Sequence, residues 1–165
     1  MSQDLICEYV ALLRAISNVS MEPFRAAMID LGFADVSSFG MSGNLLFNTS
    51  GWEVDELEAV IRARFGTPAI VRTLADMQRI VAEDPCEDSV LFLARAPSDQ
   101  RRQDFLALDF DEPRPVLRGR TVYFVHPAHV HGKRATFDFE AALGMGTARS
   151  ARVVKRIAEV MGGGG

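Results

Sequence analysis

Residues 9–31 read YVALLRAISNVSMEPFRAAMIDL, and the rest of the chain repeats the plan of this stretch. The first five residues are apolar without interruption, which is typical of a buried central strand. A polar loop follows over residues 14–20. Residues 21–31 then place apolar side chains at helical spacing, and Gly32 stands where helices commonly end. The stretch predicts a strand, a loop and a helix in succession.

The remainder of the first half continues this alternation. Hydrophobic periodicity predicts strands over residues 36–39, 44–47 and 68–71, and helices over residues 54–65 and 74–81. The resulting order, β-α-β-β-α-β, is the plan of ferredoxin-like folds.

The second half repeats this order, beginning with the apolar run 90–93, eighty positions after residues 10–13. A helix is predicted from the N-cap Ser98 to Leu106. The sequence then predicts a hairpin over residues 115–125, a short helix that ends near Leu143, and a last helix over residues 149–161.

We therefore predict an α+β protein with two ferredoxin-like βαββα-type halves, mainly antiparallel sheets and a C-terminal helix. The first half spans residues 1–84. The second, incomplete half spans residues 85–161, and residues 162–165 form a flexible glycine tail.

Composition excludes several classes of protein. The 165 residues are 48% apolar with a net charge of −4, which excludes a mainly disordered chain and disfavours a nucleic-acid partner. The apolar runs are far shorter than the about 20 residues of a membrane span, and the N-terminus lacks the cationic start of a signal peptide. The two cysteines, Cys7 and Cys86, suit reduced thiols, so we expect a cytoplasmic location.

The loop after the first strand is the leading candidate for an anion site. Arg14 offers a bidentate clamp, and Ser17 and Asn18 offer further hydrogen bonds beside a helix N-terminus. The alternative is structural, with Ser20 capping the helix and Arg14 solvated. The loop contains neither of the two glycine-rich phosphate-binding motifs, GxGxxG and GxxxxGK(S/T).

The triplet Ser42-Gly43-Asn44 has two interpretations. It predicts a tight hairpin in which Gly43 takes a positive φ and Asn44 bonds the turn backbone. In the functional alternative, Ser42 and Asn44 face the same crevice as Arg14 and Arg149.

Two further clusters carry charge or metal-binding potential. Arg149, Arg152 and Arg156 are spaced to share one face of the last helix, either as a solvated face or as an anion-binding surface. His126, His129 and His131 are weak metal candidates, because their spacing matches no regular zinc motif. We expect no metal and no cofactor.

Catalytic groups are sparse. Cys86 lies in an acidic stretch whose carboxylates raise the pKa of a thiol, so a nucleophilic role is disfavoured. No pair of carboxylates can be assigned to acid and base roles from the sequence alone.

Several short motifs resemble a bacterial family of proteins, the domain-of-unknown-function family 1697. They are Tyr9-Val10-Ala11-Leu12-Leu13-Arg14, Leu31-Gly32-Phe33, Ser42-Gly43-Asn44 and Thr147-Ala148-Arg149 ahead of Val153-Val154-Lys155. The resemblance implies a two-part ferredoxin-like fold in a soluble protein and carries no established activity. The chain departs from the family where Gly-Ile-Asn-Val-Gly-Gly is replaced by residues 15–20, and where Asn-Trp is replaced by Ser150-Ala151.

These observations favour a non-enzymatic protein that binds an anionic small molecule or nucleotide at the loop after the first strand. The expected ligand-binding residues are Arg14, Ser17, Asn18, Ser42, Asn44, Thr147 and Arg149. The alternatives are a homodimeric interaction module, paired through sheet edges or the last helix, and an enzyme acting on a phosphate- or carboxylate-bearing substrate.

Overall fold

The computed structural model describes residues 5–163, so residues 1–4 of the N-terminal stretch and the last two glycines of the expected tail lie outside it. The first repeat contains β1 (Cys7–Leu13), α1 (Glu22–Asp30), β2 (Ala34–Ser38), β3 (Asn44–Thr49), α2 (Val54–Phe65), β4 (Ala69–Thr73) and α3 (Leu74–Glu83). The second contains β5 (Ser89–Leu93), α4 (Asp99–Leu106), β6 (Val116–Arg118), β7 (Thr121–Phe124), α5 (Phe139–Leu143), β8 (Gly146–Ser150) and α6 (Ala151–Met161).

The two sheets have the same topology. Their strand orders are β2-β3-β1-β4 and β6-β7-β5-β8, and every pairing is antiparallel. Each order places the first strand of its repeat in the centre and the second strand at one edge, as the ferredoxin-like plan requires. The predicted α+β class with antiparallel sheets and a C-terminal helix is confirmed.

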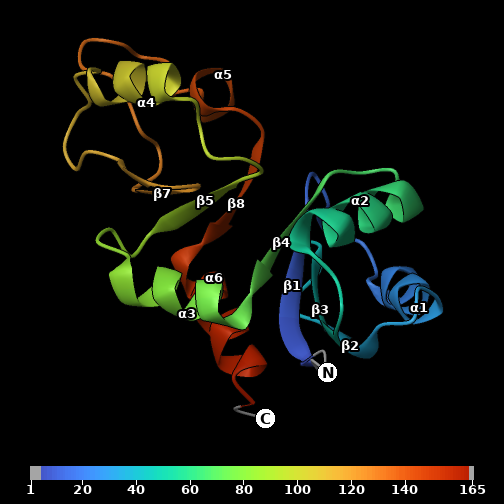
Figure 1. Ribbon diagram of the computed structural model, residues 1–165. Coiled ribbons are helices and arrows are strands. Elements are labelled where there is room, and N and C mark those ends of the chain that lie inside the picture. Colours follow the sequence, from blue (N-terminus) through green and yellow to red (C-terminus); the bar gives the residue numbers. More distant parts are fainter. Residues whose placement is uncertain (1–4, 164–165) are drawn as a thin grey trace. The chain divides into compact units, whose positions relative to one another are not determined.

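Alternation along β1 builds the first core. Tyr9, Ala11 and Leu13 point to one face of the sheet, where they pack with buried residues of α1 and α2. Figure 1 shows both helices on this face of the first sheet. Val10 and Leu12 point to the other face and are also fully buried, which explains why the run is apolar without interruption.

The second repeat is complete, which corrects the prediction that it lacks its closing strand. β8 pairs with β5 over residues 146–150, a segment read from the sequence as a helix stop and the start of the last helix. Gly146 is required there, because a Cβ would lie 2.6 Å from the carbonyl oxygen of Phe92. The segment Gly-Thr-Ala-Arg-Ser lacks the apolar alternation that reveals a strand.

Residues with capping roles mark the ends of helices α2 and α4. Helix α2 begins after a capping box between Glu53 and Glu56 and ends at Gly66, whose φ is 70°. The Ser98 hydroxyl caps α4 by accepting a hydrogen bond from the backbone N–H of Arg101. Gly162 continues the hydrogen bonding of α6, since its N–H donates to the carbonyl oxygen of Ala158 at 3.0 Å.

The chain divides into two compact units. The first contains the described residues up to Arg79 and those from Arg156 onward, and the second contains Ile80–Lys155. The boundaries between the two units therefore fall within α3 and α6. The sequence instead predicts one boundary after residue 84 and places all of α6 in the second half. Within residues 5–163, no helix has the length and apolar character needed to cross a bilayer.

Candidate functional site

The loop after β1 and the turn before β3 pack together at one end of the first sheet. The N–H of Leu13 donates to the carbonyl oxygen of Gly43 at 2.8 Å. Gly43 has a φ of 78°, and a Cβ there would lie 2.8 Å from the Cβ of Leu13. Asn44 is buried and donates from Nδ2 to the carbonyl oxygen of Phe39 at 3.0 Å. The predicted turn geometry at Gly43 and Asn44 is confirmed.

Arg14 is anchored through its backbone. Its N–H donates to the carbonyl oxygen of Pro68 at 3.0 Å, and its own carbonyl oxygen accepts from the Thr67 hydroxyl at 3.0 Å. The Arg14 side chain is half-buried, while Ser17 and Asn18 are exposed. The structure thus brings Arg14 and the turn at residues 42–44 to the same end of the sheet.

The start of α1 is poorly equipped to hold an anion. Its N-cap is Met21, without a side-chain cap, and Pro23 in the first turn has no N–H to donate. Glu22 adds a negative charge in the same turn. The Ser20 hydroxyl accepts from the Glu22 N–H at 3.3 Å, so it serves this turn and does not cap the helix.

Thr147 and Arg149 belong to β8 of the second unit and bond each other. The Arg149 guanidinium donates to the Thr147 hydroxyl at 2.7 Å and to the carbonyl oxygen of Ala148 at 2.9 Å. Burial lowers the pKa of Arg149 to about 10. The predicted helix face of Arg149, Arg152 and Arg156 is wrong, because Arg149 lies in a strand and α6 begins two residues later.

The three histidines lie on a loop that bridges back to residues 109–111. A β-bridge joins Phe110 to Val130, and the His131 ring nitrogen Nδ1 lies 3.2 Å from the carboxylate of Asp111. The Nδ1 atom of His129 lies 3.1 Å from the carbonyl oxygen of Ala135 instead. Among the described residues, no three metal-binding side chains are grouped closely enough to hold an ion.

Cys86 behaves as its sequence context predicts. Burial, followed by the charges of Asp84 and Asp88, raises the pKa of its thiol. Both cysteines are free thiols.

Equivalent backbone hydrogen bonds hold the loop after β5 and the loop after β1. The N–H of Leu93 donates to the carbonyl oxygen of Arg120 at 2.9 Å, as that of Leu13 donates to Gly43. The N–H of Ala94 donates to the carbonyl oxygen of Met145 at 2.9 Å, as that of Arg14 donates to Pro68. The two strand-to-helix loops are therefore equivalent positions of the two repeats.

A cavity of about 350 Å³ opens at this second loop. Its lining comes from the loop, the start of α4 and the end of α5: Ala94, Arg95, Ala96, Pro97, Ser98, Arg101, Leu143, Gly144 and Met145. We call it the Arg95–Arg101 cavity. Its lining carries two cationic side chains and no acidic one.

Neither arginine of the cavity is committed to a structural contact. Arg95 and Arg101 are exposed, and within residues 5–163 neither guanidinium forms an ion pair or a hydrogen bond. Arg101 reaches over Gly144, where a Cβ would lie 3.6 Å from Nη1. Neither Arg95 nor Arg101 is among the site residues predicted from the sequence. The offset of eighty residues between the two apolar runs is the signal that would have directed attention to this loop.

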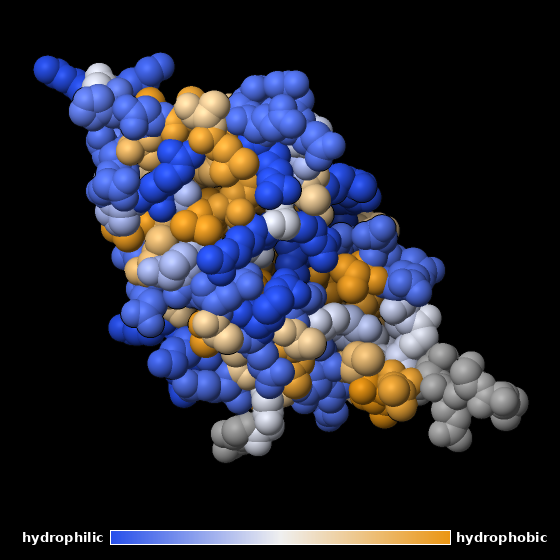
Figure 2. Space-filling model, turned by 60° about the vertical axis from the view of Figure 1, so that its left-hand side comes forward, coloured by the Kyte–Doolittle hydropathy of each residue, from blue (hydrophilic) through white to orange (hydrophobic). Residues whose placement is uncertain are grey.

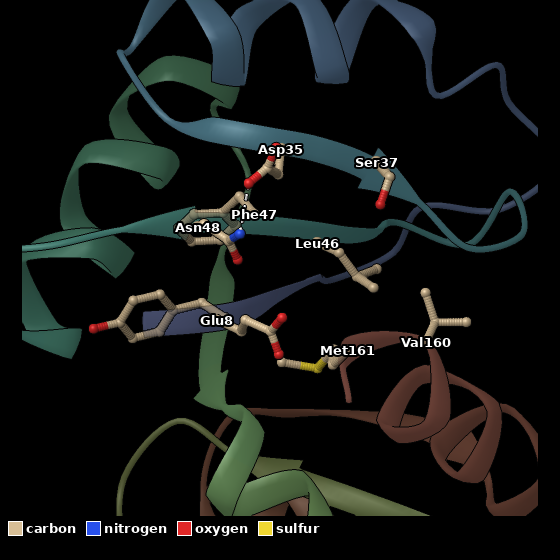
Figure 3. A pocket seen from close by; sticks show the side chains of 9 residues that line it. Glu8, Asp35, Ser37, Leu46, Phe47, Asn48, Val160 and Met161 are labelled. Carbon is tan, nitrogen blue, oxygen red and sulfur yellow. Dashed lines mark hydrogen bonds between the residues drawn. The ribbon is translucent and has the colours of Figure 1, made fainter. Parts of the chain in front are cut away.

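A second cavity, of about 280 Å³, lies beside the first sheet and has the opposite character (Figure 3). The carboxylates of Glu8 and Asp35 line it, with no lysine or arginine. Asp35 lies where the register of β2 shifts, has a φ of 51° and accepts from Asn48 Nδ2 at 2.8 Å. In Figure 3 the side chains of Glu8 and Met161 both lie at the cavity. Its carboxylates would repel an anion.

A model of a family of proteins of unknown function, DUF1697, matches residues 6–123. The chain belongs to this family. Its fold is similar to that of the conserved bacterial protein SP0830 from Streptococcus pneumoniae, with a TM-score of 0.68 and 20% sequence identity over 95% of this chain and 99% of that chain. No curated protein matches the chain. At this identity, the likeness to the solved structure extends to the fold alone.

The DUF1697 match contains both strand-to-helix loops and ends in β7. Thr147 and Arg149 lie beyond it, so the match does not include the C-terminal motif noted in the sequence.

In the resemblance noted from the sequence, Ala15 takes the place of a glycine, and its φ is 62°. A left-handed backbone is where glycine is favoured, so that glycine has a conformational reason that needs no ligand.

Proposed function

We propose that this DUF1697 protein binds a small anionic molecule and that the Arg95–Arg101 cavity is its binding site. The observation that carries the proposal is the presence of two arginines without ion pairs around one cavity whose lining holds no acid. Guanidinium groups bind carboxylate and phosphate oxygens through paired, charge-assisted hydrogen bonds.

Burial of a ligand in this cavity would strengthen its contacts with the arginines. Both side chains are exposed, so each is hydrated in the absence of a ligand. The remaining lining is mostly aliphatic, from Leu143, Met145 and Pro97 among others. An anion seated against such a wall loses part of its screening by water, which increases its attraction to both charges.

The lining supports binding and offers little for catalysis. Arginine stays protonated over the range of ordinary enzyme chemistry, so neither Arg95 nor Arg101 can act as a general base. Ser98 is the one hydroxyl side chain of the lining, and it accepts the capping bond from the Arg101 N–H. A nucleophilic serine would need a base beside it, and no histidine or carboxylate lines the cavity.

The site expected from the sequence also includes Thr147 and Arg149 of β8. Its residues in the first repeat, Arg14, Ser17, Asn18, Ser42 and Asn44, are the second position to test. The equivalence of the two loops makes it a natural competitor. Pro23, which has no N–H to donate, disfavours the first loop. An acid stands in the first turn of both following helices, Glu22 in α1 and Asp99 in α4, so this charge does not distinguish the two loops.

Homodimer formation through the outer sheet edges has less support. β2 carries the register shift at Asp35, and β6 has three residues with Pro115 directly before it. Bulges, short edge strands and prolines all discourage pairing with another chain. Figure 2 shows apolar side chains in separate patches, divided by hydrophilic ones, on the face in view.

The proposal is tested by calorimetric titration with inorganic phosphate at low ionic strength, where screening is weak. We expect saturable binding to the wild type, weakened about tenfold or more in Arg95→Gln and in Arg101→Gln. Arg102→Gln is the matched control, because Arg102 is an exposed neighbour on α4 that does not line the cavity. Its affinity should equal that of the wild type.

A second variant keeps both arginines. Ala96 is exposed and lines the cavity, so Ala96→Glu adds an opposing charge without disturbing the core. It should also weaken binding about tenfold or more. Absence of saturable binding to the wild type would overturn the proposal. So would equal affinities in the control Arg102→Gln and in Arg95→Gln, Arg101→Gln and Ala96→Glu. Loss of binding in Arg14→Gln alone would move the site to the first repeat.

A further inference from the structure

We propose that the ligand of the Arg95–Arg101 cavity is a phosphate monoester with a short aliphatic body, bound as a dianion. This inference rests on the proposed function and specifies the class of anion. It follows from the number of charges in the cavity, the chemistry of its walls and its size.

The charge of the site fits a dianion. Two arginines line one cavity, and no acidic residue lines it with them. Two acids lie near the cavity in the fold. Asp99 is in the first turn of α4, and the Glu140 carbonyl oxygen accepts a hydrogen bond from the Gly144 N–H. Neither residue contributes to the lining. A monoanion leaves one positive charge uncompensated, whereas a phosphate monoester carries close to two negative charges at neutral pH.

The walls of the cavity fit an aliphatic body. Five lining residues have aliphatic or thioether side chains: Ala94, Ala96, Pro97, Leu143 and Met145. No aromatic ring lines the cavity, so a nucleobase would find no stacking partner. Ser98 carries the one hydroxyl of the lining, so beyond the two arginines the cavity offers a single polar side chain to the several hydroxyls of a sugar.

The size of the cavity agrees with a small ligand. Its volume of about 350 Å³ lies near the lower end of the roughly 300–1,000 Å³ range of ligand pockets. A phosphate group with a chain of a few carbons fits this range better than a dinucleotide.

The test compares propyl phosphate with propyl sulfate, which has the same shape and one charge fewer. Calorimetry near pH 7.5 should show propyl phosphate binding about tenfold or more tightly than propyl sulfate, and more tightly than inorganic phosphate. Adenosine monophosphate should bind more weakly than propyl phosphate. On lowering the pH to about 5, one unit below the second phosphate pKa, the propyl phosphate affinity should fall about tenfold, while any propyl sulfate binding stays constant.

The outcomes separate this inference from the proposed function. Suppose that inorganic phosphate binds and Arg101→Gln weakens the binding, but propyl sulfate or adenosine monophosphate binds as tightly as propyl phosphate. The proposed function then stands and the ligand class is wrong. If no phosphate compound binds the wild type, both are wrong. Propyl phosphate binding that persists in the double variant Arg95→Gln/Arg101→Gln also contradicts the inference, because the dianion is then held elsewhere.

Discussion

Arg72 and Arg149 occupy the same register position in the two repeats. Arg72 of β4 pairs with Val10 of β1, and Arg149 of β8 pairs with Val90 of β5. The next strand residues, Thr73 and Ser150, each accept a hydrogen bond from a backbone N–H three residues later, at the start of the following helix. The two halves are thus equivalent in hydrogen bonding as well as in element order.

Gly43 should be the least replaceable glycine of the first sheet. Gly43→Ala combines a positive φ with a Cβ 2.8 Å from that of Leu13, so we expect a loss of about 2–4 kcal/mol in the free energy of unfolding. Chemical denaturation measures this loss.

Gly40 provides the matched control for that substitution. Its φ is 68°, but a Cβ there meets nothing within 4 Å. Backbone strain, less the smaller freedom of alanine in the unfolded chain, should make Gly40→Ala cost about 0.5–1 kcal/mol. Equal losses in both variants would show that the contact with Leu13 does not matter.

Much of the fold could be predicted because burial leaves a clear pattern. Tyr9, Ala11 and Leu13 face one core, and the residues between them are buried on the other side, which gives an uninterrupted apolar run. β8 escaped prediction because three of its five side chains are small or absent, and its place depends on the close approach of Gly146 to Phe92. A close approach between two backbone segments leaves no periodic pattern of apolar residues in the sequence.

Ala15→Gly should stabilise the protein. The φ of Ala15 is 62°, which costs an alanine about 1–2 kcal/mol relative to glycine. The greater freedom of glycine in the unfolded chain offsets about 0.4–1 kcal/mol, so a net gain of about 0.5–1 kcal/mol is expected on urea denaturation. Ala26→Gly, at an exposed position inside α1, should have the opposite sign. A loss of stability in Ala15→Gly would contradict the strain at this position.

Asp76 should stabilise α3 in a pH-dependent manner. Burial raises the pKa of its carboxyl, but hydrogen bonds from Thr73 and the charges of Arg79 and Arg72 outweigh it, and the pKa is lowered overall. A lowered pKa in the folded state gives stability that is present above the unfolded pKa and lost as the pH falls through the folded value. Asp76→Asn should therefore cost about 1 kcal/mol at neutral pH, and the difference from the wild type should shrink below about pH 4.

Asp55→Asn is the control for Asp76→Asn. Asp55 is an exposed acid in the first turn of α2, so its removal should change stability by a few tenths of a kcal/mol. An Asp76→Asn difference that stays constant from neutral pH to pH 3 would show that the carboxylate charge plays no part.

The thiol of Cys86 should become more reactive when Asp84 loses its charge. The Asp84 carboxylate accepts from the N–H groups of Cys86 and Glu87, and an asparagine Oδ1 can keep these bonds. Asp84→Asn in a Cys7→Ser background should shift the pH midpoint of Cys86 alkylation downward. The pKa should stay above its ordinary value, because burial is the larger cause of the shift. An unchanged midpoint would show that the charge of Asp84 does not contribute to the raised pKa.

The candidate site was only partly predictable. The sequence predicts an anion site at a strand-to-helix loop with an arginine. The structure contains two such loops, held by equivalent backbone hydrogen bonds. Arg95 and Arg101 are six residues apart, and only the end of α5 at Gly144 and Met145 closes a cavity around them. Tertiary closure of this kind cannot be seen in spacing along the chain.

The most direct test of the central claim is a two-dimensional amide NMR titration of the full chain with inorganic phosphate. The account predicts saturable shifts concentrated at residues 94–101 and 144–145, which Ala96→Glu removes. Shifts concentrated at residues 14–20 and 42–44, or no saturable shifts at all, would contradict it.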